Sequence, residues 1–351
     1  MRLRFAGWIC NPGPMSRAYY RPIPTLTPGA GALRLAGGWV WCDGVEVLRR
    51  DAAAVLIPAG EVPAEMRARL TAPRAPVAGL ALDRPRLMGI LNTTPDSFSD
   101  GGRFDGLGAA VAHAGLMRAQ GAEILDIGGE STRPGAREIP VPEEIERTAP
   151  VIAALRAGGV RMPISIDTRK AAVAAAALDA GADMINDVSA FGFDPEMGPL
   201  ARKRGVPACL MHARGAPETM QNDPRYDAVL LDVYDALEDR IAAQEAAGLP
   251  RSHILADPGI GFGKTLDHNL ALLRGLSLFH GLGCAILLGA SRKSFIGTLS
   301  ATPQAADRVA GSVAVALHGA AQGVQVLRVH DVEATRQALA LWAPLTQIET
   351  G

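Results

Sequence analysis

Beyond residue 87, short apolar runs alternate with alanine-rich segments of helical periodicity, and this alternation limits the possible folds more than any other feature. Eight runs have the length and composition of buried strands, namely LMGILN, EILDIGG, PISID, MINDV, ACLMH, ILADPG, AILLG and VQVLRVH. Helices are predicted between them over residues 109–120, 143–157, 170–180, 228–247 and 308–322. Closing eight parallel strands into a ring removes both exposed sheet edges. We therefore predict an α/β fold of the (β/α)8 TIM-barrel type, with an open doubly wound sheet as the alternative.

The first 86 residues have a weaker pattern that is rich in Pro, Gly and Arg. Short β-like runs occur at residues 38–42, 45–48 and 54–57, and three prolines suppress continuous helix over residues 73–86. We expect residues 1–86 to form an N-terminal extension or small α+β appendage that ends in a Pro-rich linker, and residues 87–345 to form the barrel. Translation starts at either Met1 or Met15, and the sequence does not decide between them.

The composition excludes two large classes of partner. With a formal net charge of −1, the chain has no overall positive field to attract nucleic acid or an anionic membrane. No apolar stretch approaches the roughly 20 residues of a membrane span, and the basic opening segment breaks at Asn11 before it reaches the length of a signal-peptide core. The cysteines lie far apart without metal-binding spacing, at Cys10, Cys42, Cys209 and Cys284. We expect reduced thiols in a cytoplasmic protein.

Each predicted strand ends in a polar residue. In chain order these residues are Asn92, Asp126, Asp167, Asn186, His212, Asp257, the cluster Ser291, Arg292 and Lys293, and finally Arg328 with His330. In a barrel these ends form one rim, which is where barrel enzymes carry their catalytic groups. Any single one of them could instead cap a helix or satisfy loop backbone, but eight in succession favour a site. We expect Arg292 to form a salt bridge on the rim and Lys293 and Arg328 not to.

Three loops follow predicted strands and have unusual composition. NTTPDSFSDGGRF follows the first strand, and GGESTRPGA, with Ser131, Thr132 and Arg133, follows the second. Together they are predicted to close over an anionic group, although ordinary surface turns are the alternative. DPGIGFGKT is not a phosphate-binding P-loop, because Pro258 stands where that motif requires glycine. We interpret it as a glycine-rich turn that brings Phe262 close to a ligand.

The motifs MGILNTTPDSFSDGG, DIGGESTRPGA, ISIDT, INDVS, LMH, DPGIGFGK, GASRKS and RVHD, in this order, resemble dihydropteroate synthase of folate biosynthesis. The resemblance covers residues 87–343. It implies a barrel enzyme that joins 6-hydroxymethyl-7,8-dihydropterin diphosphate to 4-aminobenzoate and releases diphosphate with the help of Mg2+. It also implies a homodimer without nucleic-acid or membrane partners. The segment before residue 86 lies outside the family core.

The resemblance also implies which residues form the site. The implied catalytic residues are Asp167, Lys293, Arg328 and Arg133. The implied pterin and diphosphate ligands are Thr132, Asp167, Asn186, Asp257, Lys293, Arg328 and His330. The implied 4-aminobenzoate contacts are Phe98, Thr132, Pro134, Phe262, Lys293 and Ser294. Asn92 is implied to hold Mg2+, with Asp96 as a weaker candidate. The expected chemistry is a dissociative substitution at the pterin methylene, in which Asp167 stabilises the cation left when diphosphate departs.

Three other functions remain possible from the sequence. A barrel that transfers a methyl group from a reduced folate to a corrinoid protein shares the pterin-binding carboxylates, but it has no need of the two diphosphate loops. A catalytically silent paralogue is expected to lack one of Asn92, Asp167, Lys293 and Arg328, and all four are present. An aldolase that uses Lys293 to form a Schiff base is the third, and borohydride trapping would distinguish it.

Overall fold

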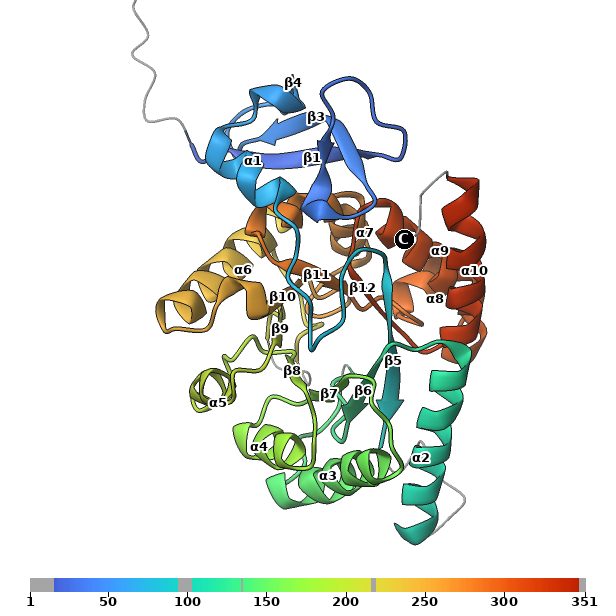
Figure 1. Ribbon diagram of the computed structural model, residues 1–351. Coiled ribbons are helices and arrows are strands. Elements are labelled where there is room, and N and C mark those ends of the chain that lie inside the picture. The colour runs from blue at the N-terminus through green and yellow to red at the C-terminus, as the bar shows by residue number, and fades with distance from the viewer. Residues whose placement is uncertain (1–15, 94–102, 134, 216–218, 347–351) are drawn as a thin grey trace, which may run out of the picture.

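Eight parallel strands close into a barrel, as the sequence predicts. The computed structural model describes residues 16–93, 103–133, 135–215 and 219–346 (Figure 1). The barrel strands pair in the order β10-β11-β12-β5-β6-β7-β8-β9, and β9 pairs with β10 to close the ring. They are β5 (Arg86–Asn92), β6 (Ile124–Gly128), β7 (Ile164–Asp167), β8 (Met184–Asp187), β9 (Ala208–Met211), β10 (Ile254–Asp257), β11 (Ala285–Leu288) and β12 (Val326–Val329). The closed ring excludes the open sheet.

Helices surround the barrel and bury its outer face. They are α2 (Arg103–Gln120), α3 (Val141–Ala157), α4 (Ala171–Asp179), α5 (Met197–Arg204), α6 (Val229–Ala246), α7 (Leu266–Arg274), α8 (Ser294–Ser300), α9 (Val309–Ala321) and α10 (Val332–Leu345). The five predicted helices all form, and α2 begins earlier than predicted. Among the described residues, no helix is long and apolar enough to cross a membrane.

The inside of the barrel is apolar at one end and polar at the other. Near the N-terminal ends of the strands, Ile124, Met184, Leu255 and Val326 belong to one buried apolar cluster. Because side chains two residues apart in a strand point to the same face, the next inward positions are Asp126, Asn186, Asp257 and Arg328. The strand pattern therefore seals one end with hydrocarbon and lines the mouth with charged and amide groups.

The N-terminal end of the barrel is closed by the segment before β5. Val77 and Leu80 form an isolated antiparallel bridge, and Val77 and Leu82 are buried in the same apolar cluster as the inward residues of the strands. The segment that the prolines predict as a linker thus plugs the barrel. It contributes to the core instead of spanning solvent.

The residues before this plug form a small antiparallel sheet with one helix. Its elements are β1 (Tyr19–Thr25), β2 (Leu33–Arg34), β3 (Trp41–Leu48), β4 (Val55–Pro58) and α1 (Ala64–Thr71). The predicted run 45–48 and the last two residues of the run 38–42 lie in the single strand β3, whereas residues 38–40 precede it, and β1 was not predicted. The reason is that β1 contains Pro22 and Pro24, which argue against a strand. β1 pairs only with β3, at an edge of the sheet where proline is tolerated.

This sheet packs on the end of the barrel opposite the mouth. Trp39 Nε1 donates to the Ala320 carbonyl at 2.8 Å, at the end of the helix that precedes β12. Ser277 lies in the short 3-10 helix (Leu276–Leu282) that precedes β11, and its Oγ donates to the carbonyl of Pro22 in β1 at 2.7 Å. Figure 1 shows the blue sheet above the barrel, with the arrow of β5 pointing away from it. The sheet therefore leaves the mouth open.

Candidate active site

Four side chains from four strands meet inside the mouth. Arg328 of β12 donates through Nε to Asp126 Oδ2 of β6 at 2.5 Å, and through Nη2 to Asp167 Oδ2 of β7 at 2.6 Å. Asn186 of β8 donates through Nδ2 to the same Asp126 oxygen at 3.1 Å. Asp126, Asp167 and Asn186 are buried. Residues that lie up to 202 positions apart in sequence thus form one hydrogen-bonded group.

The sequence-based expectation that Arg328 forms no salt bridge is wrong. Its guanidinium bridges two carboxylates. Burial by itself lowers the pKa of Arg328, but the charges of Asp126 and Asp167 outweigh burial and raise the pKa. A buried cation is stable only with counter-charge nearby, and the two facing strands supply it. Arg328 therefore fixes the carboxylates in place as well as being available to a ligand.

Three buried side-chain oxygens on β6 and β7 have no hydrogen-bond partner among the described residues. They are Asp126 Oδ1, Asp167 Oδ1 and Ser165 Oγ. Burial raises the pKa of Asp167, and the charge of Arg328 opposes that rise. Unpaired buried acceptors are costly, and they occur where a ligand with N–H donors completes the site. The mouth is thus built to receive a donor-rich molecule.

Asp257 and Lys293 lie on the side of the mouth next to Arg328. Asp257 Oδ1 accepts from the Gly259 amide at 2.7 Å. A Cβ atom on Gly289, just after β11, would lie 3.6 Å from Asp257 Oδ2 and 3.8 Å from Arg328 Cδ, so this glycine leaves room between them. Burial lowers the pKa of Lys293 to about 8, although the charge of Asp257 opposes the shift. Lys293 is therefore close to its titration point near neutral pH.

The glycine-rich turn after β10 brings Phe262 next to Lys293. Lys293 Nζ lies 4.4 Å from the centroid of the Phe262 ring and donates to the Ile260 carbonyl. Gly259 has φ +67°, and a Cβ atom there would lie only 1.9 Å from the His212 carbonyl oxygen. No other residue fits this approach of two backbones.

A buried lysine holds this turn to the end of β9. Lys264 Nζ lies 3.0 Å from His212 Nδ1 and donates to the Phe262 carbonyl at 3.0 Å. Burial lowers the pKa of Lys264 to about 7. His212 therefore supports the neighbouring turn, because both its ring and its carbonyl contact Lys264. This is the alternative to a site residue that the sequence left open for each strand end.

The end of β12 carries His330, which lies against the loop that follows β11. His330 N donates to Ser291 Oγ at 3.2 Å, and His330 Nδ1 lies 3.1 Å from the same oxygen. Burial, followed by the charges of Arg328 and Arg292, lowers the pKa of His330 to about 3, so the ring is neutral. Arg292 forms the expected rim salt bridge, with Nε 3.0 Å from Asp331 Oδ2.

The remaining predicted residues lie around this mouth or outside the described part of the chain. Thr132 and Asn92 are partly buried, whereas Arg133 and Ser294 are exposed. Phe98, Asp96 and Pro134 lie outside the described residues. Within the described ranges, no group of three or more His, Cys, Asp or Glu side chains is arranged to hold a metal ion. Cys42, Cys209 and Cys284 are free, buried thiols.

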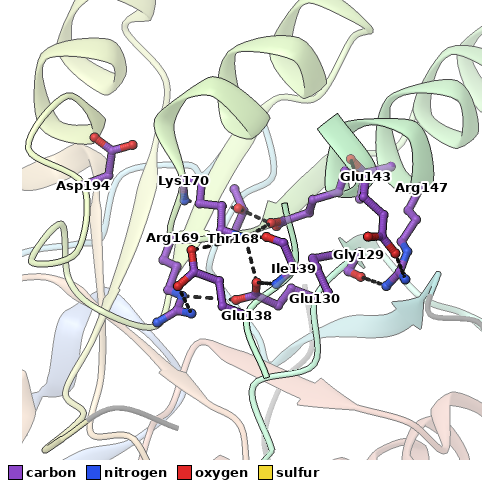
Figure 2. A network of polar contacts seen from close by, with 12 residues as sticks. Gly129, Glu130, Glu138, Ile139, Glu143, Arg147, Thr168, Arg169, Lys170 and Asp194 are labelled. Carbon is purple, nitrogen blue, oxygen red and sulfur yellow. Dashed lines mark hydrogen bonds and ion pairs between the residues drawn. The ribbon is translucent and has the colours of Figure 1, made fainter. Parts of the chain in front are cut away.

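Two features of the site were not assigned from sequence. Asp126 was noted only as a strand end, although a carboxylate at an inward position of an apolar strand is itself a signal. The second feature is a buried network of Glu130, Glu144 and Lys170 beside the mouth (Figure 2). Lys170 stands at the start of a predicted helix, where a lysine is usually solvated, so the sequence carries no signal for it.

Comparisons with known proteins place this chain in a family. Residues 88–330 match the family model described as Pterin binding enzyme. A dihydropteroate synthase of Synechocystis sp. is 46% identical over 277 residues, which is 77% of this chain and 96% of that protein. The structure of Xanthomonas albilineans dihydropteroate synthase with 4-aminobenzoic acid is 47% identical with a TM-score of 0.74, covering 79% of this chain and 99% of that one. A Yersinia pestis dihydropteroate synthase with a sulfonamide drug is 44% identical with a TM-score of 0.73, covering 78% and 99%.

A parallel barrel with buried, unpaired acceptors at its mouth and a match over residues 88–330 defines a pterin-binding enzyme. Within that class the chain belongs to the dihydropteroate synthase family, and it is a transferase of folate biosynthesis. The corrinoid methyltransferase and the silent paralogue are not favoured, because the curated relatives are dihydropteroate synthases and span most of the chain.

Proposed function

We propose that this chain joins 6-hydroxymethyl-7,8-dihydropterin diphosphate to 4-aminobenzoate, and that the polar group at the barrel mouth holds the pterin. The unpaired oxygens of Asp126 and Asp167 carry this proposal. The amino-pyrimidinone edge of a pterin is rich in N–H donors, and these acceptors are already fixed in place by Arg328. A site whose acceptors need no rearrangement loses little free energy in ordering itself on binding.

The other strand ends complete the pterin site. Asp257 and Asn186 supply further oxygen acceptors for the ring, and Lys293 donates to its carbonyl and ring-nitrogen side. The flat guanidinium of Arg328 is suited to stacking on the pterin. These roles extend the family resemblance to the positions of this chain, and the cluster's geometry is compatible with all of them.

The reaction proceeds by departure of diphosphate before attack. The bond between the pterin methylene carbon and the diphosphate oxygen breaks, and its electron pair leaves with diphosphate. Asp167 stabilises the cation that remains delocalised over the dihydropterin ring. The amine of 4-aminobenzoate then forms the new C–N bond and loses one proton to solvent or to diphosphate, so no strong general base is required.

Diphosphate meets positive charge and neutral donors on the His330 side. Arg133 and Arg328 supply cations, and Thr132 supplies a hydroxyl. If the Ser291 hydroxyl donates to His330 Nδ1, the ring proton sits on Nε2 and can donate to a phosphate oxygen. The low pKa of His330 keeps that ring neutral, so it acts as a hydrogen-bond donor and not as a second charge.

Asn92 is the residue that would hold Mg2+. Its amide oxygen is a hard ligand of the type that Mg2+ accepts, and the described residues offer no carboxylate cluster to bind the ion alone. This donor set fits an ion whose other ligands are water and diphosphate oxygens. Bound there, Mg2+ would neutralise charge on the leaving group. The homodimer, the metal ion and the cytoplasmic location remain predictions.

The second substrate lies between the glycine-rich turn and the loop after β6. Phe262 offers an apolar face to the benzoate ring, and Lys293 beside it offers positive charge. Ser294 and Thr132 supply hydroxyls, and Phe98 and Pro134 are proposed as further contacts.

The decisive experiment is a turnover assay with pterin diphosphate and 4-aminobenzoate, with and without Mg2+ and a sulfonamide. We expect equal amounts of dihydropteroate and diphosphate, a requirement for Mg2+, and relief of sulfonamide inhibition by excess 4-aminobenzoate. Diphosphate release that does not depend on 4-aminobenzoate would contradict the proposal.

The pH dependence of kcat/KM provides a separate test of Lys293. Because its pKa is lowered to about 8 in the free enzyme, the ammonium loses its proton and its charge as pH rises through that value. We therefore expect kcat/KM for pterin diphosphate to fall above about pH 8, since kcat/KM reports the free enzyme. In Lys293→Arg, residual activity should show no fall in that range. If kcat/KM of this variant still falls near pH 8, the group that titrates is a residue other than Lys293.

A further inference from the structure

The loop between β6 and α3 contains Thr132 and Arg133, and its two ends come together. The Ile139 amide donates to Glu130 Oε2 at 2.9 Å, so residues 131–138 form a closed loop with one carboxylate at its base. Because Thr132 and Arg133 lie inside this loop, the position of its base determines where they stand relative to the mouth.

Lys170 binds both ends of the loop (Figure 2). Its Nζ donates to Glu130 Oε2 at 2.6 Å and to the Ile139 carbonyl at 2.6 Å. Its third contact is Glu144 Oε2 of α3, at 2.9 Å. The three donors of the ammonium group are thus all used, and the side chain is only 3% exposed.

The same turn places this lysine close to Asp167. Thr168, directly after Asp167, donates to Glu144 Oε1 at 2.6 Å and accepts from the Lys170 amide at 3.2 Å. Arg169 Nε donates to Glu130 Oε1 at 3.1 Å. Both oxygens of Glu130 are therefore held by the turn that begins at the end of β7, which joins the loop to the strand that carries Asp167.

The network is closely packed, and its lysine stays charged. A Cβ atom on Gly129 would lie 2.9 Å from Thr148 Cγ2, so the chain entering the loop packs directly against α3. Burial lowers the pKa of Lys170, but its hydrogen bonds to Glu130 and Glu144 outweigh burial and raise it. Well-packed apolar side chains often stabilise a fold as much as a buried ionic network does, so stability alone does not account for this one.

We propose that Lys170 and Glu130 are positioning residues for the second substrate. They hold loop 131–138 at a fixed distance from Asp167, so that Thr132 and Arg133 meet 4-aminobenzoate and the departing diphosphate. The substrate named here rests on the proposed function, whereas the anchoring of the loop does not.

Glu130→Gln tests this directly, because it keeps the shape and replaces one acceptor oxygen with an NH2 group. Depending on which way the amide turns, the side chain can no longer accept either from Arg169 or from Lys170 and Ile139. We expect KM for 4-aminobenzoate to rise on the order of tenfold, while the Kd for the pterin, which the strand ends hold, stays within twofold. Backbone amides of residues 131–139 should exchange with solvent faster than in the wild type. If Glu130→Gln does not fold, Arg169→Gln removes only one contact to Glu130 and should raise the same KM by about threefold.

Glu123→Gln is the matched control. Glu123 stands before the opposite end of β6, where Glu123 Oε1 accepts from Arg86 at 2.6 Å and from Arg84 at 2.7 Å. It should lower stability without changing KM or the exchange of residues 131–139.

Wild-type KM and wild-type exchange in Glu130→Gln would overturn the inference, as would equal changes in both variants. A wild-type chain that does not condense the two substrates would instead refute the proposed function. The exchange comparison would still decide whether the loop is anchored.

Discussion

Arg328→Met is expected to abolish measurable turnover and to destabilise the barrel by about 3–5 kcal/mol, the usual cost of removing one partner of a buried ion pair. Methionine fills similar volume but leaves Asp126 and Asp167 buried without counter-charge. Turnover fails because the same guanidinium is proposed to contact both the pterin and diphosphate. Chemical denaturation and product formation measure the two effects separately.

The pH dependence of the stability of Arg328→Met tests whether the unpaired carboxylates cause the loss of stability. Burial already raises the pKa of Asp167, and loss of Arg328 removes the charge that opposes the rise. A carboxyl whose pKa is higher in the folded state than in the unfolded state binds its proton more tightly when folded, so stability increases as pH falls. We expect Arg328→Met to recover part of its lost stability between pH 7.5 and pH 5.5. The double variant with Asp126→Asn should regain stability but not turnover. A loss of stability that is independent of pH would contradict this account.

Asp257→Ala and Lys293→Ala are expected to reduce pterin affinity by about a hundredfold or more, below the range of calorimetry. Each removes a charge-assisted hydrogen bond to the ring, worth about 1.5–3 kcal/mol, and each also takes from the other residue its strongest opposite charge. Wild-type affinity in either variant would exclude that residue from the pterin site.

Asp187→Ala is the control for both substitutions. Asp187 is also a buried carboxylate at the end of a barrel strand, but its Oδ1 accepts from the Ser189 amide at 2.7 Å and its Oδ2 from the Phe191 amide at 3.1 Å. Asp187 therefore stabilises the turn that follows β8. We expect this variant to lose stability and to keep its affinity for the pterin, which separates ligand binding from the general cost of removing a buried acid.

Much of the barrel could be predicted because its strands obey a simple period. In β6, β8, β10 and β12 an inward apolar residue is followed two positions later by an inward polar one, and this pattern is visible in the sequence. Closure of the ring then brings Asn186 and Asp257 to one mouth without further information. This geometry predicts that the polar strand ends meet at one rim, whereas the role of each residue was implied by the family resemblance.

The pairings inside the mouth could not be predicted in the same way. The salt bridges of Arg328 join β12 to β6 and β7, so they depend on the exact register around the closed barrel. Lys170 gives no sequence signal, because its three acceptors come from a loop end, a helix and a backbone carbonyl. In the N-terminal segment, β1 escaped prediction since its prolines are harmless only at a sheet edge, and edge position is a property of the assembled sheet.

The location of the small N-terminal sheet has a practical consequence. Arg50 of this sheet region pairs with Asp232 at 2.6 Å, and Arg69 pairs with Glu238 at 2.8 Å. Both salt bridges attach the N-terminal segment to α6, on the outside of the barrel. The proposed substrates would enter from the other side, at the mouth. A reporter domain or a solid support attached ahead of Ser16 should therefore sit behind the catalyst and leave the route for incoming and outgoing molecules unobstructed.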